Sequence, residues 1–366
     1  MSVLTMGVEE EFLLVDRGSR RPAERAAAVI ASAARELGEQ VQTEFFASQV
    51  EVCTVPVATT AELRTELARL RRVAVAAAGE SGCGLVATGT PVVPPERPLS
   101  VTDSDRYRRM ARKFAAVVGD YDGLVCGCHV HIGAMGRAEA LALASHMRPW
   151  LPVLQSLTGN SPFCLGRDTG FDSWRFKTFS RWPTVGPAPV LQEAQYEAYV
   201  GALVKYRIVM DRRMVYWYAR PNEHVPTLEI RVADSNADVD TVVLVAALVR
   251  GLAESLRAQV AEGDPPPEVP ERWLLKAHEL AAVHGLDGRG LDPVSGEEVP
   301  AGTLVDRLVA RAAPGLEAAG DLALVEDLVR RLRCEGSGAA RQRAVLERRG
   351  RLADVVDELA RATASA

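Results

Sequence analysis

Carboxylates and imidazoles stand inside four short apolar segments that lie far apart along the chain. The segments are Gly7–Phe12 (GVEEEF), Ser48–Val52 (SQVEV), Cys128–Gly133 (CHVHIG) and Thr227–Val232 (TLEIRV). Each segment is typical of a β-strand, and a lone carboxylate buried on a strand is costly unless a cation compensates it. Four such strands in one chain predict a shared site in which divalent cations balance the acidic groups.

The spacing within these segments groups the charged side chains. Residues two apart on a strand project from the same face, and three pairs have this spacing: Glu9 with Glu11, His129 with His131, and Glu229 with Arg231. An oxygen-rich set with a histidine favours Mg²⁺ or Mn²⁺ over zinc. Two such ions beside an arginine would suit phosphoryl transfer.

Each pair alone also has an ordinary interpretation. A Glu-x-Glu strand is often an exposed edge, His-x-His is often a solvated or core pair, and Glu-x-Arg is often a surface ion pair. The combination of all three with Glu51, on strands that are otherwise apolar, favours the shared site.

Composition limits the class of protein. The chain has 366 residues, is 48% hydrophobic and carries a formal charge of −5, which suits one large domain or two smaller ones. Mild acidity argues against a nucleic-acid-binding protein, and neither a signal peptide nor a long uncharged apolar run is present. We therefore expect a cytoplasmic protein without a membrane segment. Cys126 and Cys128 could supply two zinc ligands, but no second cysteine pair with zinc-type spacing is present. We therefore expect buried, reduced thiols.

The elements that must position these residues are strands and helices without strict alternation. In the first strand, Val8, Glu10 and Phe12 are expected on one face, with Glu9 and Glu11 on the other. The expected elements are strands at Met6–Asp16, Phe45–Val55 and Leu124–Ile132, a strand pair at Met214–Ala219 and Pro226–Val232, and helices at Pro22–Glu39, Thr59–Gly79, Arg137–Thr158 and Asp238–Val260.

The chain changes character near its C-terminal end. Gly263–Pro270 is rich in proline, and residues 271–366 have hydrophobic spacing that predicts almost continuous helix. We expect residues 1–262 to form a catalytic domain and residues 271–366 to pack on it as a helical appendage, in a single unit. The stretch Asn160–Pro189 has no clear period and suits a binding loop or lid. Neither a Rossmann nor a P-loop motif is present.

The acidic and histidine segments, together with several others, resemble those of a known family. The chain is similar to the carboxylate–amine ligase group of the glutamate–cysteine ligase family 2, in the glutamine-synthetase-like superfamily. The resemblance covers essentially the whole chain, and its segments follow the family order. They are GVEEEFLLVD (7–16), EFFASQVEV (44–52), CHVHIG (128–133), NSPFCLGRDTGFDSWR (160–175), RWPTVGP (181–187), TLEIRVADS (227–235), GLDG (285–288) and GSGAARQR (336–343).

The resemblance implies a fold and a set of site residues. The fold is of the α+β class, with a curved, mainly antiparallel sheet that forms a funnel and is backed by helices. Arg231, with Glu229, would act on the transferring phosphate. The implied ligands of two or more Mg²⁺ or Mn²⁺ ions are Glu9, Glu11, Glu51, His129 and Glu229, with Glu44 as a weaker candidate and His131 outside the ligand set. The implied substrate- or phosphate-binding residues are Asn160, Arg167, Arg175, Arg220 and Arg341.

The implied activity is an ATP- and Mg²⁺-dependent carboxylate–amine ligase. It would form an amide, γ-glutamyl or similar, between an amino-acid carboxylate and a small amine through an acyl phosphate. An ATP-dependent small-molecule kinase and a metal-dependent amidohydrolase on the same acidic and histidine cluster remain alternatives. The partners are small molecules, and a homo-oligomer stays open.

The sequence departs from the family pattern at four places. Thr158-Gly159-Asn160 stands where the family usually has Ala-Asn before Ser-Pro, Tyr218 stands where an aspartate is expected, and Asn222 replaces a serine. The fourth departure, Glu279–Val283, lacks the usual tryptophan and arginine. None of the expected metal ligands is affected, so we expect the ATP chemistry to be kept while the acceptor, with or without a change of donor, differs from the family's glutamate plus cysteine.

Overall fold

An antiparallel sheet of seven strands organises the chain in the computed structural model, which describes residues 4–365. The strand order is β2-β3-β1-β5-β9-β8, and β4 also pairs with β1. The strands are β1 (Thr5–Asp16), β2 (Val41–Thr43), β3 (Gln49–Cys53), β4 (Cys83–Val86), β5 (Gly127–Gly133), β8 (Ala219–Pro221) and β9 (Thr227–Asp234). This confirms the α+β class with an antiparallel sheet.

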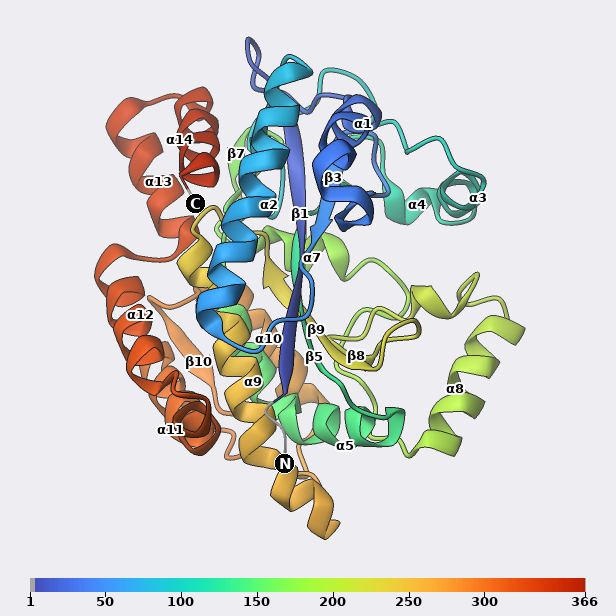
Figure 1. Cartoon of the computed structure of the whole chain (residues 1–366), viewed down its shortest axis with the longest axis vertical. Helices are drawn as coiled ribbons and strands as arrows, with labels where there is room; N and C mark the ends of the chain where they lie inside the picture. Colours follow the sequence, from blue (N-terminus) through green and yellow to red (C-terminus); the bar gives the residue numbers. More distant parts are fainter. Residues whose placement is uncertain (1–3, 366) are drawn as a thin grey trace.

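Helices cover one face of this sheet. The packed helices are α1 (Ala26–Leu37), α2 (Thr60–Glu80), α5 (Arg137–Met147), α6 (Leu151–Leu157) and α9 (Val239–Glu262). Figure 1 shows α2 and α9 lying over the long central strand β1. Helix α9 begins at the Asp238 cap and is almost wholly buried through Leu252, because apolar side chains occur on all sides of this segment. Among the described helices, none is long and apolar enough to span a bilayer.

The opposite face of the sheet is bordered by irregular chain and short elements. They are α3 (Asp105–Lys113), α4 (Ala115–Val118), the hairpin β6–β7 (Phe163–Cys164 and Arg167–Asp168), α7 (Trp174–Phe179), α8 (Glu193–Lys205) and a three-residue helix at Arg212–Met214. Two further three-residue helices, Gly38–Gln40 and Arg148–Trp150, belong to the helical side, where they contact α1 and the pair α5 and α6. The stretch Asn160–Pro189, expected as one long loop, therefore contains a hairpin and a helix. Serine hydroxyls at Ser104 and Ser173 cap α3 and α7.

The C-terminal region is mostly helical. It contains α10 (Glu271–His284), α11 (Ala301–Ala319), α12 (Leu322–Glu335), α13 (Gly338–Arg349) and α14 (Leu352–Ala364). Helix α11 packs along α9, and α14 packs on α2 and β4, so these helices extend the layer behind the sheet (Figure 1). The expectation of continuous helix was wrong at one place, where β10 (Arg289–Leu291) and β11 (Glu298–Pro300) form a hairpin.

The three consecutive glutamates of β1 have two different surroundings. Glu10 points into the helical layer and is fully buried, and Arg71 of α2 donates to its two carboxylate oxygens at 3.0 and 2.5 Å. Arg71 also donates to the carbonyl oxygens of Asn236 and Ala237 just before α9. Glu9 and Glu11 project from the other face, as the period of two predicts.

Candidate active site

The strand pairing brings the predicted acidic and histidine residues onto one face. Glu11 lies opposite Glu51 across β1 and β3, and Glu9 lies opposite His129 across β1 and β5. One step further, His131 lies opposite Glu229 across β5 and β9. Opposite residues of antiparallel strands share a face, so segments up to 220 residues apart in the sequence (Glu9 to Glu229) contribute to one surface.

Glu9 is the centre of this arrangement. Its two carboxylate oxygens lie 3.1 Å from Nδ1 of His129 and 3.2 Å from Nε2 of His131. Burial raises the pKa of Glu9, but hydrogen bonds to the two histidines outweigh burial and hold the pKa well below its usual value. Glu9 is therefore a charged acceptor that both imidazoles face.

The β1–β3 side of the face carries excess negative charge. Glu44 precedes β3 and its pKa is raised to about 8 by burial and by the charge of Glu11. Burial and the charge of Glu9 raise the pKa of Glu51 well above its usual value. The Gly127 amide donates to Glu11 at 2.7 Å. These carboxyls crowd together with too little positive charge among them, which is the condition a bound cation relieves.

The β8–β9 side, in contrast, carries arginines. Arg220 donates to the two oxygens of Glu229 at 2.9 and 3.1 Å, and Asn222 donates at 3.0 Å. Arg231 also donates to Glu229, and its guanidinium lies 3.4 Å from Nδ1 of His129. Burial raises the pKa of Glu229, but the charges of Arg220 and Arg231 hold it well below its usual value.

The pKa values of the two histidines shift in opposite directions. Burial and the nearby Arg231 lower the pKa of His129, which favours its neutral form. Burial also lowers the pKa of His131, but Glu9 and Glu229 outweigh burial and raise the pKa above its usual value. The Nε2 atom of His129 is buried without a hydrogen-bond partner, whereas Nε2 of His131 faces the Glu9 carboxylate.

These donors fit divalent cations. Two groups of three have ligand atoms within 4.8 Å of one another, and Glu9 belongs to both. One group is Glu9, Glu51 and His129, and the other is Glu9, His131 and Glu229. Carboxylate oxygens with neutral imidazole nitrogen suit Mg²⁺ or Mn²⁺. Nε2 of His129 has no hydrogen-bond partner and is therefore available as a metal ligand.

Comparison with known proteins identifies the family. The model of the glutamate–cysteine ligase family 2 matches residues 5–358. The chain belongs to this family. A relative from Salinispora tropica, provisionally named glutamate–cysteine ligase 2, is 47% identical over 352 residues, which are 96% of this chain and 92% of the relative. The chain is thus a ligase of the carboxylate–amine type.

Two solved structures share the fold at low sequence identity. A bifunctional glutathione synthetase from Pasteurella multocida aligns with a TM-score of 0.72 at 14% identity, over 99% of this chain and 52% of that one. A glutamate–cysteine ligase from Francisella tularensis, solved in complex with AMP, aligns with a TM-score of 0.67 at 12% identity, over 100% of this chain and 90% of that one. This chain therefore spans about half of the bifunctional protein.

The predicted substrate-binding residues of this chain do not all lie at the acidic and histidine cluster, which consists of Glu9, Glu51, His129, His131 and Glu229. Arg220 contacts Glu229 directly, and Arg175 is buried beside β9, where it donates to the Arg231 carbonyl at 3.3 Å. Arg167 is exposed on the β6–β7 hairpin. Asn160 is buried, and its side chain bonds to the carbonyls of Ala87 and Ser235 and to Gln342.

Arg341 lies in a different part of the molecule. Its guanidinium is 3.7 Å from Asp238 and 3.6 Å from Glu335, at the junction of α9, α12 and α13. This location is behind the sheet, on the side of α2 and α9, so the structure does not bring Arg341 to the metal-ligand candidates.

The residues that depart from the family pattern also lie in different places, some at the acidic and histidine cluster and others away from it. Asn222 is the one that hydrogen-bonds to the cluster in the described part of the chain. Tyr218 packs in the core, with its ring 4.5 Å from that of His278 on α10. Thr158 bonds to carbonyls of α6, and the Gly159 carbonyl accepts from the Ala339 amide of α13. Most of these changes therefore alter packing around the site rather than the cluster itself.

An aromatic border of the site was not among the predicted site residues. Tyr107 donates to Glu44 at 3.4 Å, and the Arg231 guanidinium lies 5.8 Å from the centre of the Tyr216 ring. Tyr216 in turn packs against Trp182. These residues come from the irregular segments around α3, α7 and β8, whose approach to the sheet depends on tertiary packing.

Proposed function

We propose that this ligase is ATP- and Mg²⁺-dependent and joins a glutamate carboxylate to a small amine through an acyl phosphate. The observation that supports the proposal is the division of one sheet face into an acidic side, around Glu9 and Glu51, and an arginine side, around Arg220 and Arg231. Such a face offers both a cation site and an anion site within one surface.

The residues Glu9, Glu51, His129, His131 and Glu229 would hold the cations, with Glu11 and Glu44 beside them. When bound, these ions would neutralise the phosphate oxygens of ATP. The lowered pKa of His129 favours the neutral ring, which can donate a lone pair to a metal ion, whereas the charge on Arg231 persists at every working pH.

The chain's own residues then have separate tasks. The Arg231 guanidinium lies beside His129 and would face the transferring phosphoryl group, where it stabilises developing negative charge. Arg220 and Asn222 fix the Glu229 carboxylate in one orientation. In the first step the substrate carboxylate oxygen bonds to the γ-phosphorus and ADP leaves. In the second step the amine nitrogen bonds to the acyl carbon, phosphate leaves and the nitrogen loses a proton.

The proposal is tested by product analysis. The purified chain is incubated with ATP, Mg²⁺ and glutamate against a panel of amines, and ADP and product masses are measured. We expect one ADP for each glutamyl amide formed, and the mass of this amide equals that of glutamate plus the amine minus one water. ADP with a stable phosphorylated product would instead show a kinase, and amide loss without nucleotide would show an amidohydrolase.

Glu229→Gln provides the matched variant. It removes a charged ligand candidate while keeping the size and a hydrogen-bonding oxygen. We expect loss of turnover together with weaker Mn²⁺ binding, measured by electron paramagnetic resonance. Normal turnover in this variant would contradict the assignment of Glu229.

A further inference from the structure

A second concave site lies behind the sheet, away from the acidic and histidine cluster. It is a cleft of about 1360 Å³ between α2, the start of α9 and the C-terminal helices α12, α13 and α14. Typical small-molecule sites occupy about 300–1,000 Å³, so this cleft is large enough for a sizeable ligand. In Figure 1 the same helices lie side by side on one flank of the molecule.

Arginines dominate the charge of this cleft. Seven arginines and five carboxylates line it, without lysine or histidine. On α2, Arg64 and Arg72 lie two helical turns apart on the side that faces the cleft, and on α13 Arg341 and Arg348 do the same from the other wall. Guanidinium groups bind phosphate and carboxylate through paired hydrogen bonds.

Two of these arginines have no carboxylate partner. Arg72 makes no hydrogen bond or ion pair with the described residues, and the hydrogen bond of Arg348 goes to the Ala344 carbonyl of its own helix. The other five are paired: Arg64 with Asp240, Arg69 with Glu66, Arg331 with Asp238 and Asp240, Arg341 with Asp238 and Glu335, and Arg361 with Glu358. The cleft therefore has positive charge available for an incoming anion.

Apart from Thr65, Asn160, Gln342 and Ser365, the remainder of the lining is apolar. Small and branched side chains contribute to it from α2, α13 and α14, among them Ala68, Ala344, Val345, Leu359 and Ala362. A ligand that fills the cleft would therefore need an apolar body as well as an anionic head.

The cleft is separate from the cluster on the other face of the sheet. Neighbouring arginines of α2 show the separation: Arg71 points inward to Glu10 of β1, whereas Arg72 is exposed and lines the cleft. A ligand held by Arg72 therefore lies on the helical side of the sheet, whereas the acidic and histidine cluster lies on the opposite face.

We propose that this cleft is a second binding site, which takes a small organic anion that combines an apolar body with a phosphate- or sulfonate-type head. The site would leave the ligase cluster free, because different faces of the sheet carry the two. Arg72 and Arg348 would bind the head, and the apolar lining of α13 and α14 would contact the body.

The test uses the full chain and the dye 8-anilinonaphthalene-1-sulfonate, which has an aromatic body and an anionic head. Dye fluorescence is titrated without ATP or metal, so the result does not depend on the ligase reaction. We expect saturable binding to the wild-type chain, displacement by tripolyphosphate, and at least tenfold weaker binding to the Arg72→Glu/Arg348→Glu variant. Ala68→Trp, which fills the apolar part, should weaken dye binding similarly.

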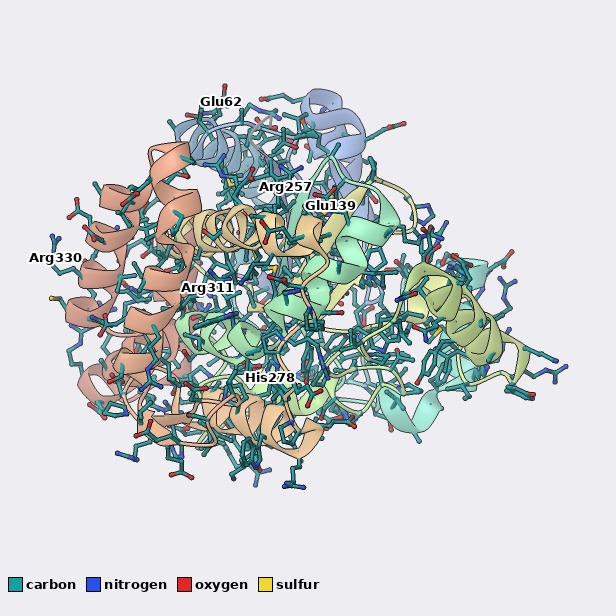
Figure 2. The ribbon with its side chains drawn as sticks, turned by 90° about the horizontal axis from the view of Figure 1, so that it is seen from below. Glu62, Glu139, Arg257, His278, Arg311 and Arg330 are labelled. Atoms are coloured by element: carbon teal, nitrogen blue, oxygen red, sulfur yellow. The ribbon has the colours of Figure 1, made fainter. Side chains whose placement is uncertain are left out.

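The control is Arg330→Glu, on α12 outside the cleft. Figure 2 shows Arg330 extending outward from the outer helices, and its side chain is 70% exposed. This variant has the same type of charge change and should bind the dye like the wild type. Should the Arg72→Glu/Arg348→Glu chain not fold by circular dichroism, Arg72→Gln/Arg348→Gln replaces it. No saturable binding to the wild-type chain, or binding to the cleft variants within twofold of wild type, would overturn the proposal.

Discussion

Arg220 and Glu229 face each other across β8 and β9, joined by two parallel hydrogen bonds of 2.9 and 3.1 Å. This bidentate geometry is stronger and more directional than a single contact. Because Arg231 and Asn222 also donate to Glu229, its oxygens are already saturated with donors. A cation at Glu229 must therefore share this carboxylate with arginine, whereas Glu51 and Glu44 have no comparable partner.

The first prediction concerns this pair. Arg220→Ala leaves Glu229 buried with fewer donors, and breaking a buried pair costs about 3–5 kcal/mol. We expect the free energy of unfolding to fall by about this amount in urea titrations, and turnover to fall with it. Arg220→Lys keeps the charge and should recover part of the stability. A neutral effect of Arg220→Ala on both readouts would contradict the pairing.

The second prediction concerns pH. The folded chain holds the Glu44 proton up to a pH of about 8, because its pKa is raised, whereas the reference value is 4.5. The folded state therefore binds more protons between these values, and stability of the metal-free chain should fall as pH rises from 4.5 to about 8. The loss should amount to a few kcal/mol, since one pKa unit is worth about 1.4 kcal/mol.

Thermal denaturation over this pH range measures the loss. Excess Mg²⁺ should flatten the curve, because a bound cation favours the charged carboxylate. Glu44→Gln should flatten it without added metal. A metal-free curve that rises over the same range would refute the sign of the effect.

The third prediction concerns Arg231. Arg231→Ala should lower kcat by about 10²–10³ if the guanidinium stabilises the transferring phosphoryl group, while the KM for ATP changes far less. Steady-state ADP release provides both constants. An equal effect on kcat and on ATP binding would show that Arg231 instead stabilises bound ATP in the ground state.

The fourth prediction concerns the core on the other face. Arg71→Met leaves the Glu10 carboxylate buried without its partner, at a cost of about 3–5 kcal/mol. The double variant Arg71→Met/Glu10→Leu should be less destabilised than either single variant, because an apolar pair replaces the ion pair. Chemical denaturation of the wild type, the two single variants and the double variant measures the coupling free energy between Arg71 and Glu10. Additive effects of the two single changes would contradict this coupling.

Much of the site could be predicted from the sequence because strand periodicity is local. Alternation along β1 placed Glu9 and Glu11 on one face and Glu10 on the other, and the structure confirms this. The short spacings within β5 and β9 likewise identified the residues that meet there. Helix α9 was also predicted closely, since its apolar run is long and ends near Gly263.

The rest depends on contacts between distant segments, which spacing does not encode. Arg341 lies in a matched motif, yet the packing of α13 on α14 and its link through Ala339 to Gly159 put it behind the sheet. The strand β8 is only Ala219–Pro221, because the preceding residues pair with irregular chain near Gly186. The partner of Glu10, on α2, had no local signal either.

The Arg71–Glu10 pair has one more consequence, for how the chain selects its alignment during folding. β1 carries three adjacent glutamates, so a slip of one residue would still present a carboxylate at two of the three positions that they occupy. After such a slip Glu9 and Glu11 would enter the core and compete for the single guanidinium of Arg71, and Glu10 alone would face the histidines. Arg71 thus makes the correct alignment of a repetitive strand energetically distinct, and the face that carries the acidic and histidine cluster is set by an ion pair that never touches it.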